Sequence, residues 1–297
     1  MSLAPRVVVV TRPSERDELI ARHGTRAAAE FYLRSREGTL ADADARHGAL
    51  ASALATVGAA IPVHWRRGHV DRSDLDRFLF APEDIVIVAG QDGLVANVAK
   101  YLDGQPVIGV DPEPGRNPGV LVRHQAASVR DLLGAVVAGR AVLGRRVMAA
   151  ATLDDGQVLT GLNELYVGHA SHQSARYVLR TADGRTERQS SSGVLAGTGT
   201  GSTGWCASIA HDRDAGPLLP APDADTLCWF VREAWPSPAT GATLTAGELS
   251  HGSTLELTCE SDRLVVFADG VEADHLTLAW GQRITLGTAP RHLNLVL

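Results

Sequence analysis

The sequence predicts a two-domain protein, in which an α/β domain built on a parallel sheet is followed by a mainly β domain. Its 297 residues exceed the usual size of one domain, and 44% hydrophobic with 21% charged residues is an ordinary globular balance. Early apolar, β-branched runs alternate with helical periodicity, which is typical of a parallel sheet covered by helices. Later segments are short and alternate in polarity. We place the domains at residues 1–125 and 126–282, and the closing strands within 283–297 can return to the first domain.

In the first domain, continuous apolar runs predict buried strands, and i, i+3, i+4 spacing predicts helices. The expected strands cover residues 7–10, 61–65, 84–89 and 107–110. One expected helix passes through Glu30 and Leu33, and others cover residues 49–57, 75–80 and 94–102. One more helix is expected at 129–137, beyond the boundary near 125. The Pro- and Gly-rich segment 111–119 is expected to be a loop.

In the second domain, the pattern predicts strands at 146–152, 158–167, 176–180, 227–232, 254–258 and 264–268, then 283–286 and 293–296. A short helix is expected at 205–209. No internal repeat interrupts this order, so the domain is expected to be one β-rich body.

Charge and cysteine content exclude several classes of protein. A net charge of -6 lacks the basic surface that nucleic acid requires, and no run of about 20 apolar residues predicts a membrane span. The apolar run before Thr11 is too short for a signal peptide, and three widely spaced cysteines predict neither a disulfide framework nor a zinc site. Lys100 is the sole lysine and no Gly-Lys-Ser/Thr occurs, which excludes a P-loop. We expect a cytoplasmic protein without nucleic-acid or membrane partners.

A glycine-rich turn follows the strongest expected strand. Gly90, Gln91, Asp92 and Gly93 come directly after residues 84–89 and before an expected helix. Ligands of α/β proteins bind at the carboxyl ends of parallel strands, where glycines let backbone N–H groups approach a phosphate. Asp92 is therefore a candidate for chemistry. Asp is also a favoured helix cap and Asp-Gly a common turn, so a purely structural role stays open.

A second glycine-rich stretch, SSSGVLAGTGTGSTGW, spans residues 190–205 and opens the short helix. Gly199, Gly201 and Gly204 match the dinucleotide pattern G-x-G-x-x-G only formally, because no βαβ unit follows. Glycines and hydroxyls that open a helix still suit a polar ligand. A mobile surface loop is the alternative.

A polar pair interrupts the apolar run VLTGLNELYVG. Asn163 and Glu164 lie inside an expected strand, where each unsatisfied buried polar group costs about 1–3 kcal/mol. A ligand can supply the missing partners. A satisfied structural pair, or a bulge at the strand end, explains the pair equally well.

Taken in order, these three segments resemble the signature of NAD kinases, which is a Gly-Gly-Asp-Gly-Thr turn, an Asn-Glu pair and a Thr-Gly-Ser-Thr loop opening a helix. Here they read GQDGL, LNELYVG and GTGTGSTGW. Two longer segments, PVIGVDPEPGRNPG and SARYVLRTADGRTERQSSSGVLAGTGTGSTGW, look most like the mitochondrial-type branch. The resemblance extends from about Val7 to Asp269-Gly270.

The resemblance implies an NAD kinase-like two-domain fold and a phosphotransferase activity. Its substrate would be the adenosine ribose 2′-hydroxyl of NAD or NADH, its donor ATP or polyphosphate, and its product NADP, with Mg²⁺ or another divalent metal as cofactor. Asp92 would be the general base. A homodimer is also implied, and the apolar segment 227–231 offers an exposed surface for it.

The resemblance also assigns binding residues. The dinucleotide would be bound by Asn163, Glu164, Thr200, Ser202, Thr203 and Trp205. The phosphates would be bound by Arg12 and by backbone N–H groups around Gly90 and Gly93. The metal would arrive with the nucleotide, since no side-chain cluster predicts a metal site.

Two positions depart from the family signature. Gln91 stands where the family has its second glycine, and Leu94 where it has threonine. Both changes affect the approach of a phosphate, so a nucleotide-binding sensor that does not turn over is an alternative function. A kinase acting on another hydroxyl substrate is a further alternative, because lipid kinases share a similar glycine-rich aspartate turn.

Overall fold

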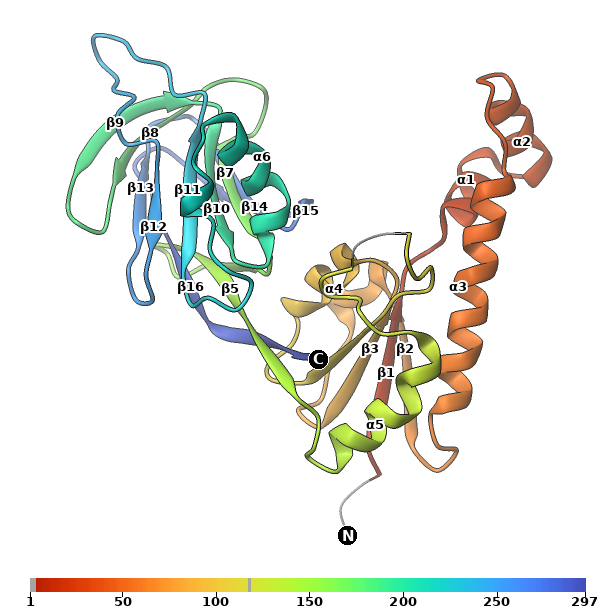
Figure 1. Cartoon of the computed structure of the whole chain (residues 1–297). Coiled ribbons are helices and arrows are strands. Elements are labelled where there is room, and N and C mark those ends of the chain that lie inside the picture. The colour runs from red at the N-terminus through yellow and green to blue at the C-terminus, as the bar shows by residue number, and fades with distance from the viewer. Residues whose placement is uncertain (1–3, 117–118) are drawn as a thin grey trace. The chain divides into compact units, whose positions relative to one another are not determined.

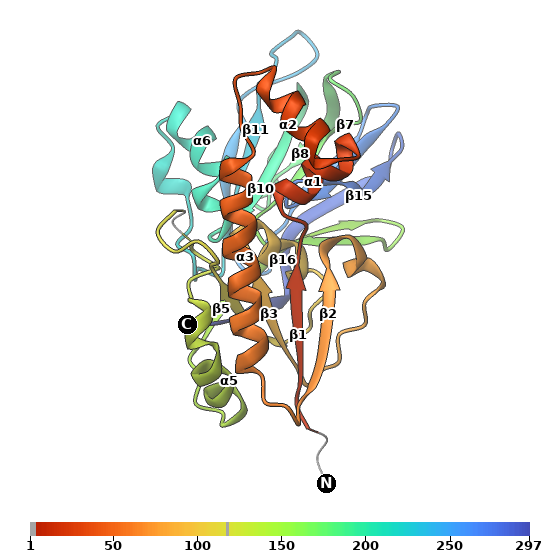
Figure 2. The ribbon, with the colours of Figure 1, turned by 90° about the vertical axis from the view of Figure 1, so that its right-hand side faces the viewer.

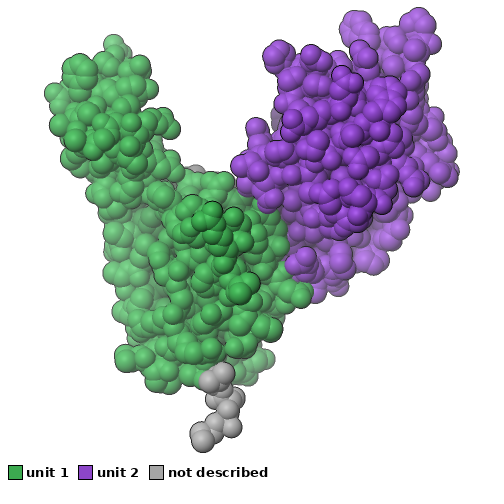
Figure 3. Space-filling view, turned by 180° about the vertical axis from the view of Figure 1, so that it is seen from behind, with its two compact units in different colours: residues 1–144, 294–297 green, residues 145–293 purple. Residues whose placement is uncertain are grey.

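The computed structural model describes residues 4–116 and 119–297, which form two compact units (Figures 1 and 3). Unit 1 extends to Gly144 and includes Asn294–Leu297, and unit 2 is Arg145–Leu293. The α/β-plus-β fold class predicted from the sequence is confirmed. The division lies beyond the boundary expected near 125, because α5 (Val129–Val137) packs into the core of unit 1.

The sheet of unit 1 has the strand order β2-β1-β3-β4-β16, and each neighbouring pair is parallel. Its strands are β1 (Arg6–Thr11), β2 (Arg66–Asp71), β3 (Asp84–Ala89), β4 (Pro106–Val110) and the end of β16 (Arg283–Val296). Every residue of β3 is buried, as expected for a central parallel strand. The chain leaves β1 toward β2 on one side and returns as β3 on the other, which creates a topological switch point between β1 and β3.

Helices α3 (Ala41–Ala60), α4 (Asp92–Ala99) and α5 cover this sheet, with 3₁₀ turns at Arg72–Arg77 and Ala126–Ser128. Helices α1 (Glu15–His23) and α2 (Arg26–Arg34) instead pack with the start of α3 in an apolar cluster of their own (Figure 1). The long helix α3 runs along the sheet (Figure 2), and Val57 packs with Val7 and Ile87 in one apolar cluster. From Leu94 onward every residue of α4 is buried. In the described part of the chain, no helix is both long and apolar enough to cross a membrane.

Unit 2 packs two sheets face to face. The six-stranded antiparallel sheet has the order β12 (Ala246–Leu249), β11 (Leu227–Arg232), β10 (Gly193–Thr198), β7 (Glu164–His169), β14 (Leu264–Ala268) and β15 (Val271–Leu278). The second sheet contains β5 (Leu143–Leu153), β6 (Val158–Gly161), β8 (Ala175–Arg180), β9 (Thr186–Ser191), β13 (Leu255–Cys259) and β16. Side chains from both sheets form the largest apolar cluster, and α6 (Trp205–Asp212) covers part of the outer face of the first sheet.

Several sequence predictions of single elements were wrong. Residues 61–65 form a turn after α3, and the strand begins at Arg66 with the polar sequence RRGHVD. The helix expected at 75–80 is a 3₁₀ turn that ends at Arg77. The segment 227–231, expected to be exposed, is buried between the sheet core and α6.

The strand expected at 158–167 is broken. β6 ends at Gly161 and β7 begins at Glu164, so Leu162 and Asn163 form a turn between them. The break places Asn163 and Glu164 at the end of β7, next to the end of β10. This position decides the geometry of the candidate site in unit 2.

Gly109 in β4 provides a direct test of the unit 1 fold. A Cβ there would lie 2.1 Å from the Leu121 carbonyl oxygen, because the segment after residue 119 crosses β4 closely. We expect Gly109→Ala to lower the free energy of unfolding by about 1–3 kcal/mol through overpacking. Gly48→Ala in α3 meets nothing within 4 Å and should raise it by about 0.5–1 kcal/mol. Urea denaturation measures both, and an unchanged midpoint for Gly109→Ala would contradict this packing.

Candidate functional site

The carboxyl ends of β1 and β3 lie side by side because these strands are parallel neighbours. Arg12 follows β1 and Gly90 follows β3, and both line one small pocket of about 80 Å³ with Gln91, Ser14 and Glu113. The structure thus brings together two of the phosphate-binding residues expected from the sequence. A guanidinium beside open backbone at a switch point suits an anionic ligand.

Asp92 holds a loop through its carboxylate. Its Oδ2 accepts the Val120 N–H at 2.8 Å, and its Oδ1 accepts the N–H groups of Leu121 at 3.0 Å and Val122 at 2.9 Å. The N-cap of α4 is Gln91, without a side-chain bond, so the interpretation of Asp92 as a helix cap was wrong. Asp92 instead fixes the segment that crosses β4.

A second pocket of about 280 Å³ surrounds Asp92. It is lined by Gly90, Gln91, Asp92, Gly93, Asp111, Gly119 and Val122. An ionised carboxylate has about four acceptor positions, and three of those on Asp92 are occupied by the loop. The remaining position is on Oδ2, so a ligand hydroxyl can donate to Asp92 only there.

Gln91 and Leu94, the two residues that depart from the family signature, lie in different surroundings. Gln91 is exposed and lines both pockets, so its side chain occupies space that a glycine would leave open. Leu94 is 2% exposed and packs beneath Gly90, where an added Cβ would approach Leu94 Cδ2 at 3.2 Å. Leu94 is therefore a core residue rather than a pocket residue.

In unit 2, two residues satisfy the whole backbone of the turn Leu162–Glu164. Asp269 accepts the N–H groups of Leu162 at 2.9 Å, Asn163 at 2.6 Å and Glu164 at 3.3 Å, and its own N–H donates to the Glu164 carbonyl at 3.1 Å. Thr198 donates its hydroxyl to the Leu162 carbonyl at 2.6 Å and its N–H to the Asn163 carbonyl at 2.9 Å. The backbone conformation of the turn is therefore stabilised without contributions from the Asn163 and Glu164 side chains.

The side chains of Asn163 and Glu164 carry hydrogen-bonding groups that the turn itself does not use. Within the described residues, neither has a hydrogen bond, although both are half-buried. Burial, and secondly the Asp269 carboxylate, raise the pKa of Glu164 to about 7. A carboxyl group that is half-buried, without a partner and shifted in pKa is a functional-site candidate.

The glycine-rich segment after β10 packs directly on this turn. A Cβ on Gly201 would lie 2.2 Å from the Asn163 carbonyl oxygen, and one on Gly199 would lie 1.8 Å from the Ala221 carbonyl oxygen. The Ser202 hydroxyl donates to the Pro220 carbonyl at 2.9 Å. Thr200 Oγ1 is buried and has no hydrogen-bond partner in the described chain. The segment is packed, so the alternative of a mobile surface loop was wrong.

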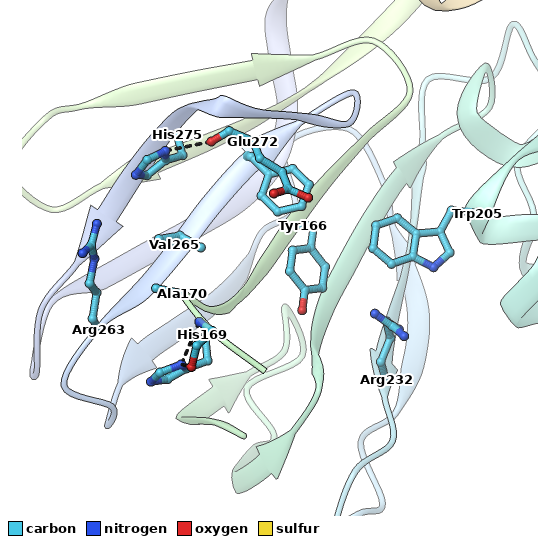
Figure 4. Close-up of a pocket in the computed structure, with 11 residues that line it drawn as sticks. Tyr166, His169, Ala170, Trp205, Arg232, Arg263, Val265, Glu272 and His275 are labelled. Atoms are coloured by element: carbon cyan, nitrogen blue, oxygen red, sulfur yellow. Dashed lines mark hydrogen bonds between the residues drawn. The ribbon is translucent and has the colours of Figure 1, made fainter. Parts of the chain in front are cut away.

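Thr203 is exposed, and Trp205 faces a separate pocket of about 480 Å³ on the outer face of the six-stranded sheet (Figure 4). There Trp205 stacks on Tyr166 at 5.3 Å, and the Arg232 guanidinium lies 5.0 Å from the Trp205 ring centre. Phe267 extends the aromatic row, 5.1 Å from Tyr166. An aromatic and cationic surface of this kind suits a planar, anionic ligand.

Three residues that shape these sites were not predicted from the sequence. Asp269 and Thr198 hold the Asn163–Glu164 turn, and Arg232 completes the aromatic pocket. The Asp-Gly dipeptide at 269–270 was the available signal, since it marks a turn between two strands. Its contacts with residues more than 100 positions away carry no local signal.

The raised pKa of Glu164 makes stability depend on pH. The folded chain keeps a proton on Glu164 up to about pH 7, whereas the unfolded chain releases it near 4.5. The stabilisation that the protonated Glu164 side chain contributes to the folded state is thus fully present below pH 4.5. As pH rises to about 7 this contribution is lost, and the free energy of unfolding should fall by about 3 kcal/mol at most. Glu164→Gln should remove this slope. Urea denaturation between pH 4.5 and 7 measures the free energy of unfolding of the wild type and of Glu164→Gln. The same pH dependence in both proteins would refute a raised pKa of Glu164.

Comparison with known proteins finds distant relatives of the chain. No model of a known protein family matches the chain. The NAD kinase of Chlorobaculum tepidum is 24% identical over 217 residues, which cover 72% of this chain and 71% of that protein. The NAD kinase of Clostridium tetani is 26% identical over 201 residues, covering 65% and 68%. The chain is therefore a distant homologue of NAD kinases.

Proposed function

We propose that the protein is an NAD(H) kinase, which transfers a phosphoryl group from ATP or polyphosphate to the adenosine ribose 2′-hydroxyl and forms NADP. The distant homology to NAD kinases supports this class of reaction. The observation that carries the proposal is the position of Asp92. It lines the pocket beside the switch point and keeps one carboxylate acceptor position free.

In the proposed step, the ribose 2′-hydroxyl donates its proton to Asp92 Oδ2 while its oxygen attacks the terminal phosphorus of the donor. The bond from that phosphorus to its bridging oxygen breaks, and the shortened phosphate chain leaves with the electron pair. Such transfers need positioning and charge stabilisation, and one carboxylate in reach of the hydroxyl. The three loop N–H groups keep the Asp92 carboxylate in a fixed orientation for this role.

The donor phosphates would bind at the ends of β1 and β3. Arg12 supplies positive charge, and the turn at Gly90 and Gly93 supplies backbone N–H groups at the start of α4. Among the described residues, no three His, Cys, Asp or Glu side chains gather to hold a metal, and Mg²⁺ often binds through one or two carboxylates plus phosphates. Asp111, which shares the pocket with Asp92, fits that role, and Mg²⁺ would neutralise phosphate charge there.

The dinucleotide would bind to unit 2. Asn163 and Glu164 offer polar groups that have no partner among residues 4–116 and 119–297, and the buried Thr200 hydroxyl is a further unused donor there. The same proposal assigns Ser202, Thr203 and Trp205 to this ligand. Trp205 has an aromatic face and a nearby guanidinium, which suit a nucleotide ring and a phosphate.

A binding protein without turnover is the second candidate, and the Gln91 side chain favours it. Gln91 lines both pockets at the switch point and narrows the approach of a phosphate to Gly90. Such a protein would bind dinucleotide without forming NADP. An assay of NADP formation separates this binding protein from the kinase.

We also propose a homodimer in the cytoplasm. The buried segment 227–231 does not provide the interface, since its side chains pack inside unit 2. Light scattering at micromolar protein decides between monomer and dimer, and a monomer mass would remove this proposal alone.

The proposed function predicts that NAD or NADP raises the melting temperature and that NADP forms. A ligand at a hundred times its Kd adds about 2.7 kcal/mol to the free energy of unfolding when it binds only the folded state. The protein is incubated with NAD or NADH and Mg²⁺, with either ATP or polyphosphate, and NADP(H) is measured enzymatically. Binding without product would favour the second candidate. Absence of any binding at millimolar dinucleotide would contradict both.

Replacing the proposed base should remove turnover. Asp92→Asn keeps the shape of the side chain but cannot accept the proton, so kcat should fall by roughly 10²–10⁴-fold with little change in dinucleotide affinity. The amide also replaces one oxygen that accepts a loop N–H, which should lower the free energy of unfolding by about 1–3 kcal/mol.

Assays well below the melting temperature separate these two effects. Asp76→Asn, which removes an exposed carboxylate in the same unit, is the matched control and should change neither quantity. An Asp92→Asn protein with wild-type turnover would eliminate Asp92 as the base.

A further inference from the structure

Asp269 has no role in the proposed reaction, yet it binds the backbone of all three residues of the turn Leu162–Glu164. Its carboxylate accepts three successive N–H groups, and its own N–H closes the contact by donating to Glu164. Asp269 adopts a left-handed conformation with φ 53°, which Asp tolerates better than most residues. Close approach requires Gly161, where a Cβ would lie 3.0 Å from Ala268 Cβ and 3.3 Å from Asp269 Oδ1.

We propose that Asp269 is the positioning residue of the dinucleotide site, which fixes the directions of the Asn163 and Glu164 side chains by binding the backbone of their turn. This inference rests on the proposed function, since it assigns a ligand to those side chains. The reason why Asp269 fixes the turn lies in the backbone of the turn itself. A turn that interrupts a sheet has no partner strand for its N–H groups, so one carboxylate that accepts all three selects a single conformation.

A second effect of Asp269 is electrostatic. Its carboxylate is the charged group that acts on Glu164 from the β14–β15 turn. The Cys206 thiol of α6 is a nearby titratable group, whose own pKa is raised in part by Glu164. Residue Gly197, which pairs with Glu164 from β10, carries no charge. Asp269 therefore contributes to the raised pKa of Glu164, and dinucleotide affinity should depend on pH around 7.

Asp269→Asn tests both effects. Asn also tolerates the left-handed conformation and keeps one oxygen for Asn163 and Glu164, but it loses the charge and the acceptor for the Leu162 N–H. We expect NAD affinity, measured by calorimetry, to fall roughly tenfold or more, because small misplacements of binding groups are costly. Binding of ATP to unit 1 should stay unchanged. Asp262→Asn, at an exposed turn of the same unit, is the matched control.

The pH profiles distinguish positioning from a loss of stability. The midpoint of the pH dependence of NAD affinity should move to lower pH in Asp269→Asn, because removing a neighbouring negative charge lowers the pKa of Glu164. Without ligand, the fall in stability between pH 4.5 and about 7 should also shrink.

The ligand-free profile keeps the two proposals separable. If the wild type binds no dinucleotide, the proposed function fails, and a ligand-free profile altered by Asp269→Asn would still show that Asp269 controls Glu164. A folded Asp269→Asn protein with the wild-type NAD affinity and the wild-type pH profile would overturn the inference.

Discussion

The candidate sites depend on one interaction used twice, a carboxylate that accepts three successive backbone N–H groups. Asp92 binds residues 120–122 in this way, and Asp269 binds residues 162–164. Apart from Glu164, the first residue of β7, the bound residues lie outside regular structure, where N–H groups have neither a helical turn nor a partner strand to accept them. Bonds to an ionised acceptor are about twice as strong as neutral ones, so one side chain can hold a loop that would otherwise be variable.

The three hydrogen bonds from the loop also bear on the proposed role of Asp92 as a base. A base that stood free in a pocket could rotate, whereas three N–H groups fix the plane of the Asp92 carboxylate and direct its remaining acceptor position. Structural and chemical roles are then not alternatives, because the contacts that hold the loop also orient the oxygen. The same reasoning applies to Glu164, whose direction follows from a turn held by Asp269 and Thr198 rather than from its own contacts.

The sequence predicted central elements well and sheet edges badly. The strands β3, β11 and β14 and the helix α5 have the predicted bounds, because burial on both faces or one apolar stripe gives a strong pattern. The missed or misplaced strands β2, β9, β12 and β15 lie at the ends of the strand orders. Two further errors concern central strands, because the strand expected at 158–167 is divided into β6 and β7, and the strands expected at 283–286 and 293–296 are one strand, β16. Edge strands keep polar residues, as in TERQSS of β9, so their pattern is weak. Likewise, local motifs indicated Asp92 and Asn163, whereas Asp269 acts over a distance in sequence that no motif spans.

Packing explains the glycines that formally match a dinucleotide pattern. A Cβ on Gly199 or Gly201 would clash with a backbone carbonyl oxygen, of Ala221 and Asn163 respectively, whereas a Cβ on Gly204 would make only an ordinary contact, 3.7 Å from the Gly201 carbonyl oxygen. The first two are therefore required by loop-on-loop contact, and no phosphate needs to be invoked for them. That contact buries Thr200 beside the turn of Asn163 and leaves its hydroxyl without a partner. A buried donor without a partner costs about 1–3 kcal/mol, which a ligand or a water molecule that accepts from it would recover. In the proposed dinucleotide site, the glycines would therefore act indirectly, by bringing a donor into position rather than by touching the ligand.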